Sequence, residues 1–229
     1  MDFISPKDII VEFLRVHMTD PRARAEALKT NTFDGAVTSF TLAPTTGRTA
    51  YCLTSVKVGG VEQKKYTDYY FNEQDQKVIF YIAPVAGTLN VAIIFKEGTS
   101  NWVYPDKAKE SLSTTSFPRI SIMKVAGAGK RLGQYNSNVE TVSQFQIDIW
   151  VKEDYVATLG SIKYAEEKLA EYLAYQILNA FKLYEADLFS QLYNYTLLSG
   201  PRDLGFDKTY QCFHEIVEVE LKSIDSGNV

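Results

Sequence analysis

The segment with the most suggestive chemistry is Gly127-Ala128-Gly129-Lys130-Arg131, a glycine-rich run followed by a lysine. A phosphate-binding loop of the Gly-x-x-x-x-Gly-Lys-Ser/Thr type needs a second glycine upstream and a hydroxyl after the lysine. The upstream position holds Lys124 and the hydroxyl position holds Arg131. The pattern fails, so we interpret the segment as a flexible hairpin loop with two positive charges.

Few other side chains can act as nucleophile, general base or metal ligand. The two histidines, His17 and His214, leave little material for a metal site or a catalytic triad. Glu218 and Glu220 lie on the polar face of a segment that alternates like a strand. This position favours a solvated or interfacial face over an acid/base pair. The sequence contains neither Gly-x-Ser-x-Gly nor His-Glu-x-x-His. We therefore expect no catalytic residue, no cofactor and no metal, and a protein that is not an enzyme.

Bulk properties exclude further classes. The first residues lack the basic and apolar regions of a secretory signal, so Cys52 and Cys212 are expected as buried free thiols, with a disulfide as the alternative. No run approaches the roughly 18 apolar residues of a membrane helix, and no membrane partner is expected. The net charge of −4 offers no broad basic field for non-specific nucleic-acid binding.

The first element predicted from the sequence is a short helix. Ser5 suits an N-cap, Pro6 suits the first helical position, and Pro21 lies where the helix should have ended. His17 closes the apolar stripe and is expected as a packed residue rather than a ligand. Residues 22–34 are polar and are interpreted as a linker.

Residues 38–95 alternate with a period of two, which is typical of strands. Gly59-Gly60 supplies a hairpin turn. One strand is expected to point the following side chains to a single face: Cys52, Thr54, Val56 and Val58. Later inward-facing positions are expected at Val78, Phe80, Ile82, Val91, Ile93 and Phe95. Short strands separated by regular turns predict a small antiparallel β-sandwich or barrel.

Residues 117–153 predict a β-hairpin with a long polar loop at 126–141. Its apolar face is expected to carry Ile120, Ile122, Phe145, Ile147, Ile149 and Val151. A helix from about residue 159 to 189 has an apolar stripe wide enough to cover that face. A final strand is expected at 210–221, after a turn at Ser199-Gly200-Pro201.

The polar face of the return strand is a candidate interface. It carries Gln144, Gln146, Asp148 and Trp150. A tryptophan on a polar strand face is covered either by local packing or by a neighbouring subunit. Trp102 and Tyr104, in the linker at 96–116, either hold that linker against a domain or contact a partner chain. These six residues form the predicted interface with other subunits or partner proteins.

This order of elements resembles the tail terminator (tail completion) proteins of long-tailed double-stranded DNA phages and related archaeal viruses. The resemblance rests on Phe117-Pro118-Arg119-Ile120-Ser121-Ile122, on Phe145-Gln146-Ile147-Asp148-Ile149-Trp150-Val151-Lys152, and on the helix that follows. It covers residues 1–20 and 117–221. The intervening part is similar to a small β-domain that recurs in phage virion proteins, through Val56-Lys57-Val58-Gly59-Gly60-Val61 and Ala83-Pro84-Val85-Ala86-Gly87.

The resemblance implies an α+β fold: a terminator-like antiparallel sheet with a long packed helix, plus an inserted small all-β, sandwich-like domain. The expected boundaries are 1–30 for the first helix and linker, 31–105 for the inserted domain and 106–229 for the terminator-like domain. The insertion departs from minimal terminators.

The resemblance also implies a function. The protein would be a virion protein of the neck, assembled in the host cytoplasm as a ring, usually a homohexamer, that caps the tail tube and meets the head-side connector or stopper. Lys124, Lys130 and Arg131 near the loop would face DNA in transit or simply be solvated. The alternatives are another neck ring protein (head completion or adaptor) and a surface or carbohydrate-binding module using Tyr66, Tyr69, Tyr70 and Phe71.

Overall fold

The chain folds into two compact units, each with its own set of sheets. The computed structural model describes residues 5–22, 26–98, 101–105, 117–131, 139–189 and 193–225. The main unit comprises Met1–Arg22 and Trp102–Val229, and the inserted unit comprises Ala23–Asn101. The protein is a mixed α+β protein with many strands and few helices, which confirms the predicted fold class at this level.

The observed division differs from the expected boundaries of 1–30, 31–105 and 106–229. The segment 22–34, interpreted as a linker, contains strand β1 (Glu26–Phe33), which pairs with β7 (Gly87–Gly98). Strand β1 alternates exposed and half-buried residues along most of its length, so its sequence lacks the apolar alternation of a strand that faces a core. Its ladder with β7 places it in the inserted unit.

The inserted unit consists of two antiparallel sheets. One has the order β1-β7-β3-β4, with β3 at Thr49–Val58 and β4 at Val61–Glu62; the other has the order β2-β6-β5, with β2 at Ser39–Thr41, β6 at Lys77–Phe80 and β5 at Tyr69–Asn72. Both sheets contribute side chains to one buried core, among them Phe33, Phe40, Leu53, Val56, Val78, Phe80, Ile93 and Phe95. This is the arrangement of a small β-sandwich.

Two details of the inserted unit differ from the predicted side-chain pattern. Strand β3 has register irregularities between Ala50 and Cys52 and between Leu53 and Ser55, and such bulges reverse the side-chain alternation. Leu53 therefore reaches the core together with Val56 and Val58, while Cys52 and Thr54 are not part of this core cluster. The predicted face is correct at Val56 and Val58 and wrong at Cys52 and Thr54. Strand β6 ends at Phe80, which leaves Ile82 84% exposed. The Gly59-Gly60 turn is confirmed, since both glycines have positive φ between β3 and β4.

The main unit is built on one five-stranded sheet. Its order is β13-β14-β10-β9-β8, with β8 at Val103–Tyr104, β9 at Arg119–Arg131, β10 at Val139–Lys152, β13 at Tyr193–Asp207 and β14 at Cys212–Asp225. The pairs β9–β10, β10–β14 and β14–β13 are antiparallel, and β8 pairs in parallel with β9. The linker predicted at 96–116 therefore includes the end of β7 and all of β8; residues 106–116 lie outside the described part.

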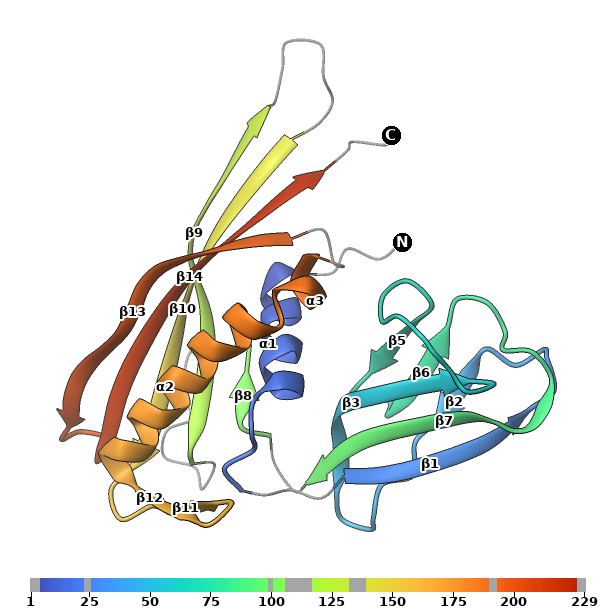
Figure 1. Ribbon diagram of the computed structural model, residues 1–229, viewed down its shortest axis with the longest axis horizontal. Helices are drawn as coiled ribbons and strands as arrows, with labels where there is room; N and C mark the ends of the chain where they lie inside the picture. Colours follow the sequence, from blue (N-terminus) through green and yellow to red (C-terminus); the bar gives the residue numbers. More distant parts are fainter. Residues whose placement is uncertain are drawn as a thin grey trace. The chain divides into compact units, whose positions relative to one another are not determined.

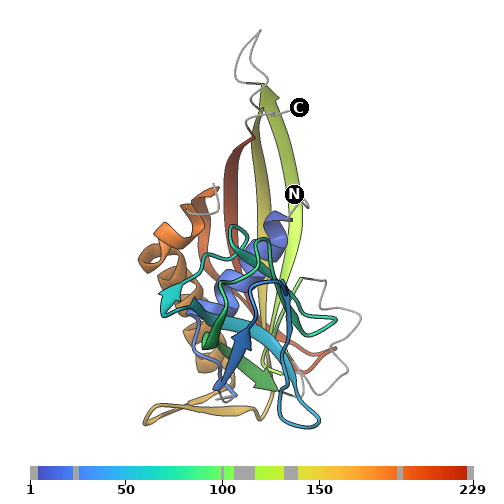
Figure 2. The same ribbon diagram turned by 90° about the vertical axis from the view of Figure 1, so that its right-hand side faces the viewer.

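Helices cover one face of this sheet (Figures 1 and 2). Helix α2 (Glu166–Leu183) packs on β10, β13 and β14, and helix α1 (Pro6–His17) packs on β8, β9 and α2. Eight sheet residues beneath them are apolar and at most 1% exposed: Ile120, Ile122, Phe145, Ile147, Ile149, Val151, Val217 and Val219. The predicted apolar face of the hairpin and its helical cover are confirmed.

The helical region is shorter than predicted and is interrupted. A hairpin of β11 (Val156–Leu159) and β12 (Ile162–Ala165) precedes α2, and a short helix α3 (Glu185–Phe189) follows it. Gly160, with φ +64°, lies at the turn of this hairpin. Because a positive φ is incompatible with helical backbone, the chain cannot be helical from residue 159, as the apolar stripe suggested.

Helix α1 agrees with its sequence signals. Its first turn is capped by the Ser5 hydroxyl, which accepts a bond from the Lys7 amide. His17 is a packed residue, as predicted: its ring stacks on Tyr184 at 4.1 Å, and its Nε2 lies 2.9 Å from Oδ2 of Asp187. Both cysteines are buried free thiols, as predicted.

The hairpin strands extend far into the predicted loop. Strand β9 continues to Arg131 and β10 begins at Val139, and their ladder pairs Arg131 with Val139. The expected loop at 126–141 is therefore largely strand, and its middle, 132–138, lies outside the described residues. In the same way β13 passes through Ser199-Gly200-Pro201, where a turn was expected, and accommodates these residues with register shifts.

Candidate functional site

The sheet face opposite the helices carries a chain of polar contacts, and we treat it as the candidate functional site. His214 Nε2 lies 2.8 Å from Oδ1 of Asp148, and Gln146 Nε2 donates to the same oxygen at 2.9 Å. The His214 ring stacks on Trp150, with centroids 3.6 Å apart and an interplanar angle of 11°. This network spans β10 and β14, which places Gln146, Asp148 and Trp150 together as the alternation predicted.

For both tryptophans the structure supports packing within the chain over the alternative of a contact with another subunit. Trp150 is 4% exposed and lies in a cluster with Phe117, Cys212 and Tyr210. Trp102 is fully buried in the main unit. Both rings are therefore covered from within the chain, and neither presents its surface to another subunit. Tyr104 is half-buried, and its ring receives the Arg119 guanidinium at 3.9 Å.

Arg119 and Ser121, which were not predicted as site residues, belong to the same face. Arg119 is 3% exposed, and its Nε donates to the Ser121 hydroxyl at 3.1 Å. Ser121 lies opposite Asp148 on β9, whereas His214 lies on β14, the other neighbour of β10. In the described structure His214 contacts Asp148 and Ser121 contacts Arg119, which is not the Ser–His arrangement that activates a serine nucleophile.

Further along the face, Gln144 and the two glutamates form ordinary polar pairs. Hydrogen bonds from Gln144 Nε2 (3.2 Å) and the Lys222 ammonium (3.2 Å) to Glu220 hold the pKa of that carboxyl below its usual range. Glu218 accepts a bond from Ser199 and lies 4.0 Å from Arg202. A glutamate with a lowered pKa stays ionised at neutral pH, so Glu220 is suited to pairing and not to donating a proton.

The three basic residues of the predicted loop lie in strand β9. Lys124 is exposed and pairs with Phe145, while Lys130 pairs with Glu140 and Arg131 with Val139. A β-carbon added at Gly127 would lie 2.8 Å from Lys124 Cε, so the lysine side chain extends along its own strand. The predicted loop that was to carry these three residues is therefore replaced, at their positions, by a paired strand.

An unexpected carboxylate lies under the helix layer. Glu215 on β14 is 6% exposed. Burial raises its pKa, and the nearby carboxylates of Asp203, Glu171 and Glu167 raise it further, against a smaller opposing effect of His214. A raised pKa means that the folded state holds the proton more tightly than the unfolded state. The contribution of Glu215 to stability is therefore greatest at acid pH and is lost as the pH rises through its folded pKa.

Replacing Glu215 with glutamine should stabilise the main unit at neutral pH. The substitution keeps the size of the side chain and removes the unfavourable charge, and we expect the free energy of unfolding at pH 7 to rise by about 1 kcal/mol. Urea denaturation at pH 4 and pH 7 would measure it, with a smaller gain expected at pH 4. The exposed Glu171→Gln is the matched control and should change stability less. A loss of stability at pH 7 for E215Q would contradict this account.

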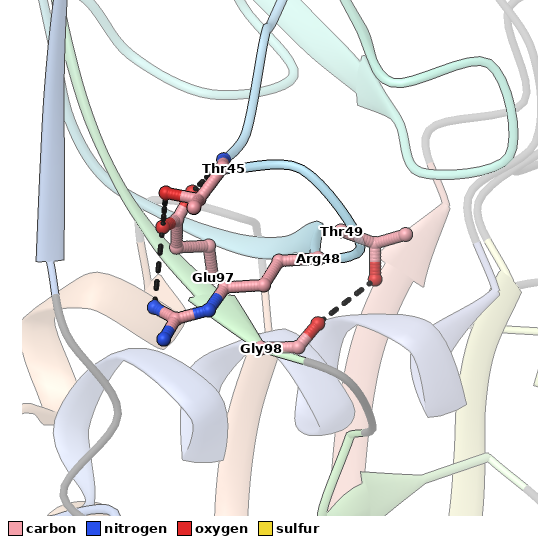
Figure 3. A network of polar contacts seen from close by, with 5 residues as sticks. All are labelled: Thr45, Arg48, Thr49, Glu97 and Gly98. Atoms are coloured by element: carbon pink, nitrogen blue, oxygen red, sulfur yellow. Dashed lines mark hydrogen bonds and ion pairs between the residues drawn. The ribbon is translucent and has the colours of Figure 1, made fainter.

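A buried carboxylate network joins two segments of the inserted unit (Figure 3). Glu97 is 4% exposed and accepts bonds from the Thr45 amide (2.8 Å) and hydroxyl, with Arg48 Nη1 3.4 Å from its Oε1. Burial alone raises the pKa of Glu97, but the two Thr45 bonds and the Arg48 charge outweigh it, so the pKa is lowered. These three residues fix the loop before β3 to β7, which is a structural role.

The aromatic residues considered for sugar binding do not lie on one exposed surface. Tyr69 is 5% exposed, and Phe71 packs against the sandwich core. Tyr70 is half-buried and lies beside Tyr81, with ring centroids 5.8 Å apart. An exposed aromatic platform across Tyr66, Tyr69, Tyr70 and Phe71 is therefore absent from this part of the inserted unit.

Among the described residues, no group of three or more histidine, cysteine, aspartate or glutamate side chains has the arrangement of a metal site. No helix in the described ranges combines the length and apolar character needed to cross a membrane. Comparison with known proteins finds no matching family model, no similar curated protein and no similar solved structure.

Proposed function

We propose that the protein is a ring-forming structural protein of a virus particle, placed at the head–tail junction. There it caps the tail tube, ends its polymerisation and joins the tail to the head-side connector. The observation that carries the proposal is the free edge of β9. Strand β8 pairs only with Ile120 and Ser121, and in the described part of the chain no strand pairs with the outer side of β9 from Ile122 to Arg131.

A long unpaired strand is a natural site for association with another chain, because its amide and carbonyl groups are ready to extend the sheet. Residues 124–129 on this strand are exposed. The hairpin also continues past the end of α2 (Figures 1 and 2), so the free edge is accessible. Most monomeric proteins protect such an edge, and its length here favours an assembly protein over an enzyme.

The order of elements in the main unit supports the specific assembly. A first helix, a hairpin, a helix across its apolar face and two final strands follow one another, which is the order on which the resemblance to tail terminators rests. The closed ring that this resemblance implies requires two different surfaces per subunit, joined head to tail. The main-unit sheet offers two different edges that meet this requirement: β13 on one side, and on the other the part of β9 beyond the two residues paired with β8.

The proposal is tested by observing the assembled protein. Mass photometry of the full chain should show a discrete oligomer, with six copies the expected number. Negative-stain electron microscopy should show rings, and these should cap tail tubes purified from the same virus and stop their elongation. A protein that stays monomeric at micromolar concentration, both alone and with tubes, would refute the proposal.

The inserted unit has no counterpart in a minimal terminator, and it favours a second candidate function elsewhere in the neck. Another neck ring, such as a head-completion or adaptor protein, would also form rings. It would bind the head-side connector and leave tube length unchanged in the elongation assay, whereas a terminator would fix that length.

A further inference from the structure

We propose that the ring joint is a β-ladder in which the outer edge of β9 pairs, antiparallel, with β13 of the next copy. The segments are 122–131 of one copy and Tyr193–Leu197 of its neighbour. This inference rests on the proposed ring and adds which surfaces close it. It is carried by the direction of the strands, by the pattern of open and protected backbone on the two edges, and by the charges.

The strand directions permit a continuous sheet. Four long strands lie in the order β13-β14-β10-β9, and each pair of neighbours is antiparallel. The first and fourth strands of such a set run in opposite directions. Rotation about an axis parallel to the strands preserves direction, so it brings β9 of one copy beside an antiparallel β13 of the next. A cyclic ring can therefore continue the alternation from subunit to subunit without a break.

The two edges are open at the same level of the sheet. Through the register, Lys124, Ala126 and Ala128 of β9 align across β10 and β14 with Leu197, Thr196 and Asn194 of β13. Between Tyr193 and Leu197 the pairing of β13 with β14 is regular. The sequence Tyr-Asn-Tyr-Thr-Leu there has no charge and no proline, the composition of an edge without protection against pairing.

The other half of each edge is closed to a partner. On β9, Ile120 donates its amide to the Trp102 carbonyl at 2.7 Å, and β8 covers this stretch. On β13, Pro201 and three register shifts between Leu197 and Gly205 interrupt the strand. Proline and bulges are the usual devices that prevent edge pairing. On both edges of the sheet, the protected part and the open part of the strand therefore lie at the same level along the strand direction.

The charges favour β13 over a second β9 as the partner. Residues 119–131 contain four basic residues and no acidic one: Arg119, Lys124, Lys130 and Arg131. Antiparallel pairing of two β9 edges around Gly127 would bring Lys124 opposite Lys130 of the other copy. Like charges directly opposite each other destabilise a ladder. The uncharged segment at 193–197 avoids this repulsion, so the contact is head to tail and not two-fold.

The hydrogen-bond parity identifies the groups that would form the joint. The Ile120 amide points away from β10. Because amide direction alternates along a strand, the amides of Ile122 and Lys124 point the same way. Beyond the bulge at residues 124–126, Gly127 pairs with Ser143 and Gly129 pairs with Thr141. The amides of these two glycines also point away from β10. Their amides are the donors available to a neighbour. Neither glycine has a positive φ, so substitution at Gly129 meets no backbone restriction of that kind.

Disulfide trapping in the full chain tests the ladder. Four double variants combine Ala126→Cys or Ala128→Cys with Asn194→Cys or Thr196→Cys, all on the same side of the sheet by register. Across a paired joint the two cysteines of at least one combination come within the range of a disulfide. Mild oxidation should then give a covalent ladder of multimers on denaturing gels. The matched control, Ala128→Cys with Lys163→Cys on the β11–β12 hairpin, should give none.

A second variant removes one proposed bond without touching the β9–β10 ladder. Gly129→Pro eliminates an outward amide and should weaken association about tenfold, the effect of one hydrogen bond. Gly129→Ala keeps the amide and should associate as the parent does. Circular dichroism of both variants confirms that the main unit is folded.

The outcomes separate the two proposals. Rings with a covalent ladder and a defect specific to Gly129→Pro support the joint. Rings that never cross-link at these positions and tolerate Gly129→Pro overturn the joint and leave the ring intact. Dimers cross-linked through Ala128→Cys alone would show β9–β9 pairing and overturn it as well. The absence of any oligomer would overturn the ring and the joint together.

Discussion

Replacing Trp150 with alanine is expected to lower the free energy of unfolding of the main unit by about 3–5 kcal/mol, the usual cost of deleting a large buried aromatic side chain. The ring is 4% exposed, packs with Phe117 and Cys212, meets Tyr210 edge-on at 6.1 Å and stacks on His214. Removing it would leave a cavity between the strands and would release His214 from its position beside Asp148.

The conservative variant Trp150→Phe should cost much less, about 1–2 kcal/mol. The indole Nε1 is buried, and in the described structure it has no hydrogen-bond partner. A phenyl ring therefore sacrifices no hydrogen bond and mainly loses packing area. Urea denaturation followed by far-ultraviolet circular dichroism would measure both variants, and the fluorescence of Trp102, also in the main unit, would provide an independent signal.

The result decides between two roles of this residue. If Trp150 lay in a subunit interface, alanine would reduce oligomer formation and leave the unfolding of the monomer unchanged. The buried position predicts the reverse: destabilised monomers, and assembly affected only as far as folding is. Unchanged urea stability together with a loss of rings would contradict the packing described here.

The sequence could predict which residues share a face, because that depends only on the period of the strand. Ile147 and Ile149 on the helix side, and Asp148 and Trp150 on the other, are placed by the alternation. What covers each face depends on contacts between distant parts of the chain. Trp150 is enclosed by Phe117, Tyr210 and Cys212, and no local pattern in β10 contains that information.

The extent of the hairpin could not be predicted for a related reason. Residues 126–129 are alternating alanine and glycine, which have low intrinsic strand propensity and indicate a loop. They form strand because β10 offers a complete ladder on that side, itself supported by β14. Strand propensity is strongly dependent on context, so a weak sequence can be held in the sheet by its neighbours.

Local strain and bulges explain the remaining differences. The bulges in β3 reverse a side-chain pattern that is otherwise regular, and the positive φ of Gly160 creates a hairpin inside an apparent helical stripe. Buried polar networks are equally hard to read from sequence. The bond between Arg119 and Ser121 joins residues two apart, but Thr45 and Glu97 are separated by 52 positions.

Replacing Glu97 with glutamine is expected to lower the stability of the inserted unit at pH 7 by about 2–3 kcal/mol, the range for a buried charged group that loses its hydrogen bonds. Both carboxylate oxygens accept bonds, one from the Thr45 amide and one from its hydroxyl. A glutamine in the same position presents an NH2 group to one of these donors. It also leaves Arg48 without its counter-charge.

The pH dependence follows from the lowered pKa of Glu97. The unfolded chain takes up the proton at the ordinary value of 4.5, whereas the folded chain resists protonation until a lower pH. The stabilisation is therefore fully present above the unfolded pKa and is lost as the pH falls through the folded pKa. We expect the difference between the parent protein and Glu97→Gln to be constant from pH 6 to 8 and to shrink below about pH 4.5.

Hydrogen–deuterium exchange of the full chain, read at the amides of β3 and β7, would measure the effect in the inserted unit alone. Both tryptophans belong to the main unit, so an unchanged tryptophan unfolding curve would confirm that the loss is local. Glu26→Gln, at an exposed position of β1, is the matched control and should change protection by less than about 0.5 kcal/mol. Equal effects of the two substitutions, or a difference that persists undiminished at acid pH, would show that the network around Glu97 does not stabilise the sandwich.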